Sequence, residues 1–460
     1  MTATTVPAAS GPRGSRLLGL ARELAHDPTG TYEAVMLANP VVGRMVIGPP
    51  GRRVTLYLVS HPDGVQEVLV GSGRVHTKDT PFYREIAAWI GNGLLTSEGA
   101  TWKQQRRTLA PLFTPRRIAT YGTAMAEEAS AVADRFADAA RAGVPVDLHA
   151  EMTEYTLRVV GRLLFGANVD SAVPAIRTMF PVLNEYVRAR AFSPLRLPRT
   201  WPTPRQRRAV RARNALYDVV DRIIAARRRT SDPVSDDLVS RLLAARDPET
   251  GDPLSPGEVR DQVLIFLLAG HETTSTALTF ALHLLGQHPE IQDRARREAV
   301  EALGGGAGGR APTADDVAGL PYTDMVVREA MRLYPPAFAV GRYTPRAATV
   351  AGHDLPAGSV VVVSPWATHR HPEFWPEPAR FDPDRFRPDA VAARHKYAYL
   401  PFSAGPRNCI GNHFAMLEAV IALACLLRAV RLRTEPAKIK LATGITLRPA
   451  QPVLAKVSVA

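Results

Sequence analysis

Residues Leu267 to Leu278, "LLAGHETTSTAL", place an acid and several hydroxyls in the middle of an apolar run. Buried groups of this kind persist only when they are hydrogen-bonded or when they do chemistry. Two interpretations are open. In the first, the hydroxyls bond back to carbonyls four residues earlier and Glu272 pairs with a buried arginine. In the second, the small residues Ala269 and Gly270 admit a flat cofactor, and Glu272 and Thr273 carry protons to it.

Cys409 is a second group that could do chemistry. It ends a loop rich in proline and glycine, "YLPFSAGPRNC", and a helix is predicted to begin directly after it. A thiolate at a helix N-terminus is favoured by free N–H groups and by the helix dipole. Gly405 and Gly411 allow tight turns and the close approach of a ring, and Arg407 can reach an anionic substituent. Cys425, in the apolar stretch "ALACLL", is predicted to be a small buried hydrophobe.

The acid-bearing run belongs to a long predicted helix. Ser255, Pro256 and Glu258 form a helix start with a capping box, and the next firm stop is Pro289. The helix is therefore roughly 30 residues or about 45 Å long, the width of a domain. Apolar residues lie around much of its circumference, which predicts a central position. Glu272 near its midpoint argues against a membrane span.

Other elements are expected on both sides of this helix. "RMVIGPPGRRVTLYLVS" predicts two strands joined by a turn, and "TVAGHDLPAGSVVVVS" and "KLATGITLRPAQPVLAKVSV" predict strand pairs. Residues 1–30 are predicted to be a loose tail and residues 31–460 a single domain. The proline-rich residues 193–205 are predicted to form a mobile lid, and the glycine-rich residues 303–310 a surface loop.

Composition narrows the class of protein. The chain has 460 residues, 46% hydrophobic, with 57 Lys and Arg against 44 Asp and Glu and a formal charge of +13. No nucleic-acid motif accompanies this charge, so an acidic protein partner is favoured over nucleic acid. Two cysteines argue against a disulfide framework. The N-terminus contains neither a secretory signal nor an apolar membrane anchor, so a cytoplasmic location is expected.

Four motifs in order carry a family resemblance. Phe402-x-x-Gly405-x-Arg407-x-Cys409-x-Gly411 resembles the haem-binding signature of the cytochrome P-450 superfamily, and "AGHETT" resembles its oxygen-activation helix. "EAMR" and "FDPDRF" occupy the expected places between them. The resemblance extends from about residue 102 to the C-terminus, and the N-terminal strands also fit. It implies a mainly α fold with a minor antiparallel or mixed β region. Haem b would lie between the long central helix and the helix after the cysteine loop.

The resemblance also implies roles for individual residues. Cys409 would be the axial ligand of the haem iron. Dioxygen activation and proton delivery would involve Ala269, Gly270, Glu272 and Thr273. The haem would be held by Trp102, Arg106, Arg342, Phe402, Arg407 and Gly411. A buried ion network that supports the cysteine loop would consist of Glu329, Arg332 and Arg385.

The resemblance also implies a class of substrate and an electron donor. An apolar pocket is predicted from Phe82, Leu94, Ala337, Phe338, Val340 and Ile445. A terpenoid or polyketide-type natural product would fit, and the residue usage is typical of an actinomycete. Electrons from NAD(P)H would arrive through a separate acidic ferredoxin or flavodoxin. This partner would dock on Lys103, Arg107, Arg116, Arg117, Arg394 and Lys396.

The motifs leave alternatives. Hydroxylation, epoxidation, oxidative coupling and multi-step oxidation are not separated by them. A haem-binding sensor or a non-catalytic scaffold is the alternative from another functional class, although neither needs the acid and the hydroxyl of Glu272 and Thr273.

Overall fold

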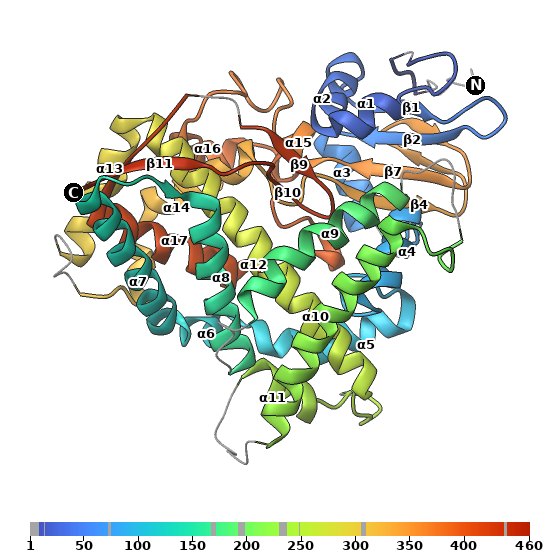
Figure 1. The fold of residues 1–460 in the computed structure, drawn as a ribbon. Helices are drawn as coiled ribbons and strands as arrows, with labels where there is room; N and C mark the ends of the chain where they lie inside the picture. The colour runs from blue at the N-terminus through green and yellow to red at the C-terminus, as the bar shows by residue number, and fades with distance from the viewer. Residues whose placement is uncertain are drawn as a thin grey trace.

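The computed structural model describes residues 9–12, 14–71, 75–166, 172–191, 198–229, 237–247, 249–304, 310–436 and 439–460. Helices dominate and the β region is minor, as the sequence predicted, and the small sheets lie to one side of the molecule (Figure 1). The central helix α12 (Pro256–Gln287) begins with the predicted capping box, in which Ser255 and Glu258 bond to each other's backbone N–H. Most of its residues are buried on every side, so it is the core helix around which the others pack.

The helices in contact with α12 include those that build the site. Helix α12 packs against α8 (Leu148–Phe165), α10 (Pro204–Arg229), α14 (Pro321–Leu333) and α17 (Asn412–Ala429), and of these α8, α14 and α17 contribute residues to the site. Both α12 and α17 are long and apolar enough to cross a membrane. However, 83% and 67% of their most apolar windows are buried inside the protein, so both are core helices.

The remaining helices cover this core. They are α1 (Ala21–His26), α2 (Pro28–Ala38), α3 (Pro62–Val70), α4 (Pro81–Ile90), α5 (Gly99–Leu109), α6 (Pro115–Ala119), α7 (Gly122–Ala142), α9 (Val173–Ala191), α11 (Leu238–Ala244), α13 (Pro289–Leu303), α15 (Pro365–Thr368) and α16 (Pro388–Ala393).

Four strands from distant parts of the chain form the largest sheet, in the order β1-β2-β7-β4. The strands β1 (Val42–Ile47) and β2 (Val54–Val59) are the predicted hairpin. Strand β2 pairs in parallel with β7 (Ser359–Val363), which pairs antiparallel with β4 (Val340–Thr344). The sheet is therefore mixed, and it ties the N-terminal strands to the C-terminal half of the chain.

The smaller sheets complete the β region. One contains β3 (Val146–Asp147), β11 (Leu454–Val459) and β8 (Val430–Thr434). The two hairpins are β5 (Ala348–Val350) with β6 (His353–Leu355), and β9 (Leu441–Thr443) with β10 (Leu447–Pro449). The turn between β9 and β10 reaches toward α12.

The N-terminal segment differs from the predicted loose tail. Gly19 bridges to Ile47 of β1, and Leu20 and Leu24 are buried. Asp27 caps α2 by accepting the Gly30 N–H at 2.8 Å. Residues 14–30 are thus part of the fold. Residues 1–8 and 13 lie outside the described residues, as do 193–197 of the predicted lid and 305–309 of the predicted glycine-rich loop.

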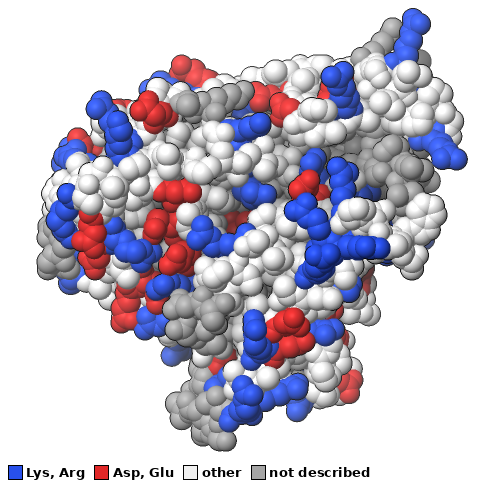
Figure 2. Space-filling model, viewed as in Figure 1, with Lys and Arg blue, Asp and Glu red and all other residues white. Residues whose placement is uncertain are grey.

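The positive charge is spread unevenly over the surface. Figure 2 shows basic and acidic side chains interspersed over α7 and α8, whereas basic side chains predominate over the region of α9 and α10. The N-terminal half of α10 contributes Arg205, Arg207, Arg208 and Arg211, all of them exposed.

Candidate active site

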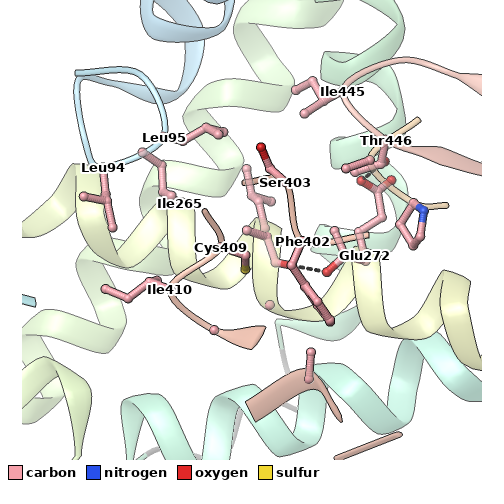
Figure 3. Close-up of a pocket in the computed structure, with 18 of the residues that line it drawn as sticks. Leu94, Leu95, Ile265, Glu272, Phe402, Ser403, Cys409, Ile410, Ile445 and Thr446 are labelled. Atoms are coloured by element: carbon pink, nitrogen blue, oxygen red, sulfur yellow. Dashed lines mark hydrogen bonds between the residues drawn. The ribbon is translucent and has the colours of Figure 1, made fainter. Parts of the chain in front are cut away.

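A cavity of about 330 Å³ lies between α12 and the loop that ends at Cys409. Its size falls within the range of small-molecule sites, about 300–1,000 Å³. Most of the lining is apolar. Figure 3 shows how Leu94, Leu95, Ile265 and Ile410 surround the cavity near the Cys409 sulfur, while Glu272 and Thr446 lie together at another part of the wall.

The cysteine loop presents its thiol to the cavity. The Cys409 N–H donates to the Phe402 carbonyl at 2.9 Å, which closes the loop, and α17 begins at Asn412. The side chain is accessible from the cavity yet deep within the molecule. Burial raises the pKa of its thiol, while the Gly411 N–H and the Arg106 charge oppose this rise. The thiolate is therefore supported by one hydrogen bond and one nearby cation.

The polar centre of α12 combines both interpretations of its sequence. Thr273 donates to the Ala269 carbonyl at 2.8 Å, as a helical hydroxyl without a partner would. Nevertheless Ala269, Gly270, Glu272 and Thr273 all line the cavity. The next residue, Thr274, lines it as well. The hydrogen bond within the helix thus satisfies the Thr273 hydroxyl without removing it from the cavity.

Glu272 is held by the β9–β10 turn. Its carboxylate accepts a hydrogen bond from the Thr446 hydroxyl, and one oxygen lies 3.9 Å from Nε of Arg448. Burial raises the pKa of Glu272 to about 7, against the lowering effects of Thr446 and Arg448. Near neutral pH this acid can therefore both release and take up a proton. The neighbouring His271 faces away, with its Nδ1 2.6 Å from the Leu267 carbonyl oxygen and its ring against Phe180.

Two glycines are required by close packing against neighbouring helices. A Cβ at Gly270 would lie 3.0 Å from Val160 of α8, so the absence of a side chain lets α8 and α12 approach each other. Gly405 has φ +70°, and a Cβ there would lie 2.2 Å from the Leu69 carbonyl oxygen of α3. At both positions the missing Cβ makes room for neighbouring protein, and the positive φ of Gly405 fits the tight turn predicted there. By contrast, a Cβ at Gly411 would meet nothing within 4 Å.

Cationic side chains gather at one end of the cavity. Lys78, Arg342 and Arg407 line it there, and Arg407 pairs with Glu98 at 2.9 Å. Arg342 is 1% exposed, and among the described residues no carboxylate lies within ion-pair distance of it. Burial and the charges of Arg342 and Arg407 lower the pKa of Lys78 well below its usual range. Within the part of the chain that the structure describes, Glu98 is the one carboxylate that pairs with any of these three side chains, and a bound anion would favour their charged forms, so this end of the cavity suits an anion.

The two predicted haem-binding residues on α5, Trp102 and Arg106, make different contacts. Trp102 lies under the Arg407 guanidinium, 3.9 Å from its ring centroid. Arg106 donates to the Asn408 carbonyl at 3.1 Å and to the Asn408 side chain at 2.9 Å, directly before the cysteine. Both residues line the cavity. Arg106 therefore holds the cysteine loop as well as facing the cavity.

The predicted ion network lies behind the cysteine loop. Arg332 donates to both Glu329 oxygens at 2.6 and 2.8 Å, and both side chains are fully buried. Arg385 lies 3.6 Å from Glu329. Arg332 also donates to the His369 carbonyl at 3.0 Å, and the His369 ring accepts the Leu400 N–H at 2.9 Å. This chain of contacts ends two residues before Phe402, whose carbonyl closes the loop.

The predicted pocket residues separate into two groups. Phe82, Leu94, Ala337, Val340 and Ile445 line the cavity. The prediction for Phe338 is wrong, because its ring stacks on Tyr32 of α2 at 6.4 Å and belongs to another buried cluster. In an extended segment successive side chains point to opposite sides, so Phe338 faces away where Ala337 and Ala339 face the cavity.

Comparison with known proteins decides the family. The cytochrome P450 family model matches residues 12–456. The chain belongs to the cytochrome P450 family. Cyclooctatin synthase of Streptomyces melanosporofaciens is 37% identical, covering 95% of this chain and 91% of that protein. Pentalenene oxygenase of Streptomyces avermitilis is 34% identical, covering 95% and 94%. This P450 also resembles the crystal structure of the cytochrome P450DA heme domain, with TM-score 0.86, 26% identity and coverage of 99% and 98%.

Family membership makes this protein a P450 monooxygenase and implies haem, and the cavity fits that group. Haem has one iron, a flat apolar ring and two carboxylates. The accessible Cys409 thiol supplies a ligand, and Lys78, Arg342 and Arg407 gather where the carboxylates could bind. The apolar walls between them suit the ring.

Lys78, Thr446 and Asn184 are among the residues that line or support the site and were not predicted from the sequence. Lys78 stands alone between predicted elements, and no spacing connects it to the cysteine loop. Thr446 and Asn184 come from a short hairpin and from α9, and neither belongs to a motif. The bridge between Thr77 and Tyr343 places Lys78 beside Arg342. Such pairing between distant segments has no local signal in the chain.

Proposed function

We propose that this P450 hydroxylates or epoxidises an apolar cyclic terpenoid in the cytoplasm, with electrons delivered by a separate protein. The observation that carries this proposal is an apolar cavity with a thiol on one wall and an acid and an alcohol on the other. When bound, haem supplies the redox-active iron that activates dioxygen. The chain's residues hold the haem, exclude water and deliver protons.

The residues that would hold the haem act at three points. Cys409 would bind the iron, with its charge stabilised by the Gly411 N–H and by Arg106. Lys78, Arg342 and Arg407 would bind the carboxylates, and Phe402 lies on the thiol side of the cavity. Trp102 keeps Arg407 in place through their cation–π contact.

Proton delivery would fall to Glu272 and Thr273. The Thr273 hydroxyl lies on the cavity wall and is hydrogen-bonded to the Ala269 carbonyl, so it can donate outward only by giving up that bond. Glu272, with a pKa of about 7, would resupply protons from the interior side. This division of roles fits a relay in which the alcohol contacts the reacting group and the acid restores its proton.

The substrate wall supports a hydrocarbon-like molecule. Phe82, Ile86, Leu94, Phe180 and Ile445 present carbon surface to the cavity. The Thr446 hydroxyl is already engaged by Glu272. The names of two similar proteins include pentalenene and cyclooctat-9-en-7-ol. A substrate with few polar groups would match such a wall, because an unpaired polar group would be costly to bury there.

The reduced carbon monoxide complex tests the proposal directly. We expect a strongly red-shifted Soret band, as thiolate ligation of haem gives, and we expect Cys409→Ser to lose it. Cys425→Ser is the matched control, because Cys425 is buried in the core and does not line the cavity. A folded, haem-loaded protein without the shifted band would contradict the proposal.

The electron donor would be an acidic ferredoxin or flavodoxin, itself reduced from NAD(P)H. Of the predicted docking residues, Lys103, Arg116 and Lys396 are exposed. Arg107 pairs with Asp247 and Glu249, at 3.3 and 3.0 Å. Arg394 stacks on Trp375 at 3.9 Å from the ring centroid and donates to the Arg385 carbonyl. The docking proposal therefore rests mainly on the three exposed residues.

Salt should slow reduction by an acidic ferredoxin. Screening shortens the reach of exposed charges, so we expect the reduction rate to fall by about tenfold or more between about 0.05 and 0.5 M salt. Lys103→Glu combined with Arg116→Glu should slow reduction at low salt by a similar factor. Arg228→Glu combined with Arg229→Glu on α10 makes the same charge change at other exposed positions and should have little effect. Equal rates at all salt concentrations would contradict a charged docking face.

A further inference from the structure

The acid of the proposed relay is tied to a turn that also forms the substrate wall. Thr446, which is 7% exposed, donates its hydroxyl hydrogen to Glu272, which is 5% exposed (Figure 3). Thr446 lies in the turn between β9 and β10, and the preceding residue, Ile445, lines the cavity. One turn thus contacts both the acid and the space for the substrate.

This turn is itself fixed from two sides. The Ile445 N–H donates to the side-chain oxygen of Asn184, at 2.7 Å, and Asn184 is a buried residue of α9. A Cβ on Gly444 would lie 2.1 Å from that same oxygen, so only glycine permits the contact. On the other side, the Leu447 N–H donates to the Pro336 carbonyl at 2.8 Å. The turn therefore cannot shift without breaking a bond to α9 or to the segment after α14.

The charges around Glu272 are few. Among the described residues, Arg448 is the cation within ion-pair distance, at 3.9 Å. The His271 ring packs edge-on against Phe180, and its Nδ1 lies 2.6 Å from the Leu267 carbonyl oxygen, so its hydrogen bond is to the helix backbone. Within this small set Thr446 is the side-chain hydrogen-bond donor to the carboxylate, so removing its hydroxyl removes the main local stabilisation of the charged form.

We propose that Thr446 and Asn184 are positioning residues for Glu272: Asn184 holds the β9–β10 turn, and Thr446 on that turn orients the carboxylate toward the cavity. The inference rests on the proposed function, in which Glu272 supplies protons. The position of the Glu272 carboxylate would then depend on α9, through Asn184, and on a substrate that packs against Ile445 of the same turn.

Infrared titration of the haem-loaded protein tests this without turnover. The band of the protonated carboxyl is assigned by its absence in Glu272→Gln, and its midpoint pH is measured in each variant. Loss of a hydrogen bond to the carboxylate favours the neutral acid, so Thr446→Val should raise the midpoint by about one pH unit. Thr446→Ser keeps the donor and should restore the wild-type midpoint. Asn184→Ala should raise it by a smaller amount.

Thr443→Val in the same hairpin is the matched control and should leave the midpoint unchanged, since no side-chain hydrogen bond of Thr443 to Glu272 exists among the described residues. A melting curve for each variant shows that it is folded. An unchanged midpoint in folded Thr446→Val would overturn the proposal. Failure of the proposed function is distinguished by the carbon monoxide spectrum, which Thr446→Val should leave intact.

A second measurement relates the position of the acid to catalysis. With a substrate in hand, the share of electrons recovered in product should fall in Thr446→Val and recover in Thr446→Ser. A loss that serine does not restore would point to a change in the cavity wall and would count against the positioning role.

Discussion

Replacing Glu329 with alanine is expected to lower the free energy of unfolding by about 3–5 kcal/mol and to leave the protein almost without haem. The cost arises because Arg332, which is fully buried, loses both carboxylate contacts while its charge stays in place. The damage should reach the cysteine loop, since Arg332 also binds the His369 carbonyl and His369 binds the N–H of Leu400.

Chemical denaturation gives the free energy of unfolding, and the ratio of haem to protein absorbance gives the haem content. Glu301→Ala removes an exposed acid from α13 and should change neither quantity. If Glu329→Ala does not accumulate as soluble protein, Glu329→Gln keeps one acceptor oxygen and should show a smaller loss in the same direction. Normal haem content in either folded variant would contradict a supporting role for the network.

Local signals explain why much of this site was predictable. The capping box of α12 involves neighbours three residues apart, and the cysteine loop is a continuous segment whose turn residues and thiol are visible in the sequence. Glu329 and Arg332 meet because helical residues three apart share a face. The propensities and spacings that identify such features depend only on a short stretch of chain.

Contacts between segments that are distant in the sequence could not be predicted from such local features. Lys78 acquires its place through the bridge between Thr77 and Tyr343, and Thr446 through a hairpin whose turn reaches α12. The wrong side was predicted for Phe338 because the register of an extended segment depends on what packs against each face. The N-terminal segment looked loose because its few apolar residues become buried only when β1 is in place.

Glu272→Gln is expected to reduce product formation by about 10²–10⁴-fold, the usual contribution of a general acid or base, while haem content and the carbon monoxide spectrum stay normal. The amide keeps the size of the side chain and can still accept from Thr446, so the cavity should be preserved. What it loses is the proton that Glu272 releases near neutral pH. A rate within about threefold of wild type would contradict a relay role for the acid.

The same variant should change how stability depends on pH. Burial raises the pKa of Glu272 from 4.5 to about 7 in the folded protein, so the folded state holds this proton more tightly than the unfolded state. Its contribution to stability is therefore complete below about pH 4.5 and is lost as the pH rises through about 7, an effect on the order of 3 kcal/mol. Melting temperatures should fall between pH 5 and pH 8 more steeply in wild type than in Glu272→Gln.

Glu301→Gln, at an exposed position, should follow the wild-type curve. A purely structural role for Glu272 would instead shift the melting temperature equally at every pH, because an uncharged contact does not titrate. Since the Thr446 hydroxyl and Arg448 both favour the carboxylate, the difference between the wild-type and Glu272→Gln curves should become larger in a Thr446→Val background. Only an acid that titrates in place, held by that turn, gives both results.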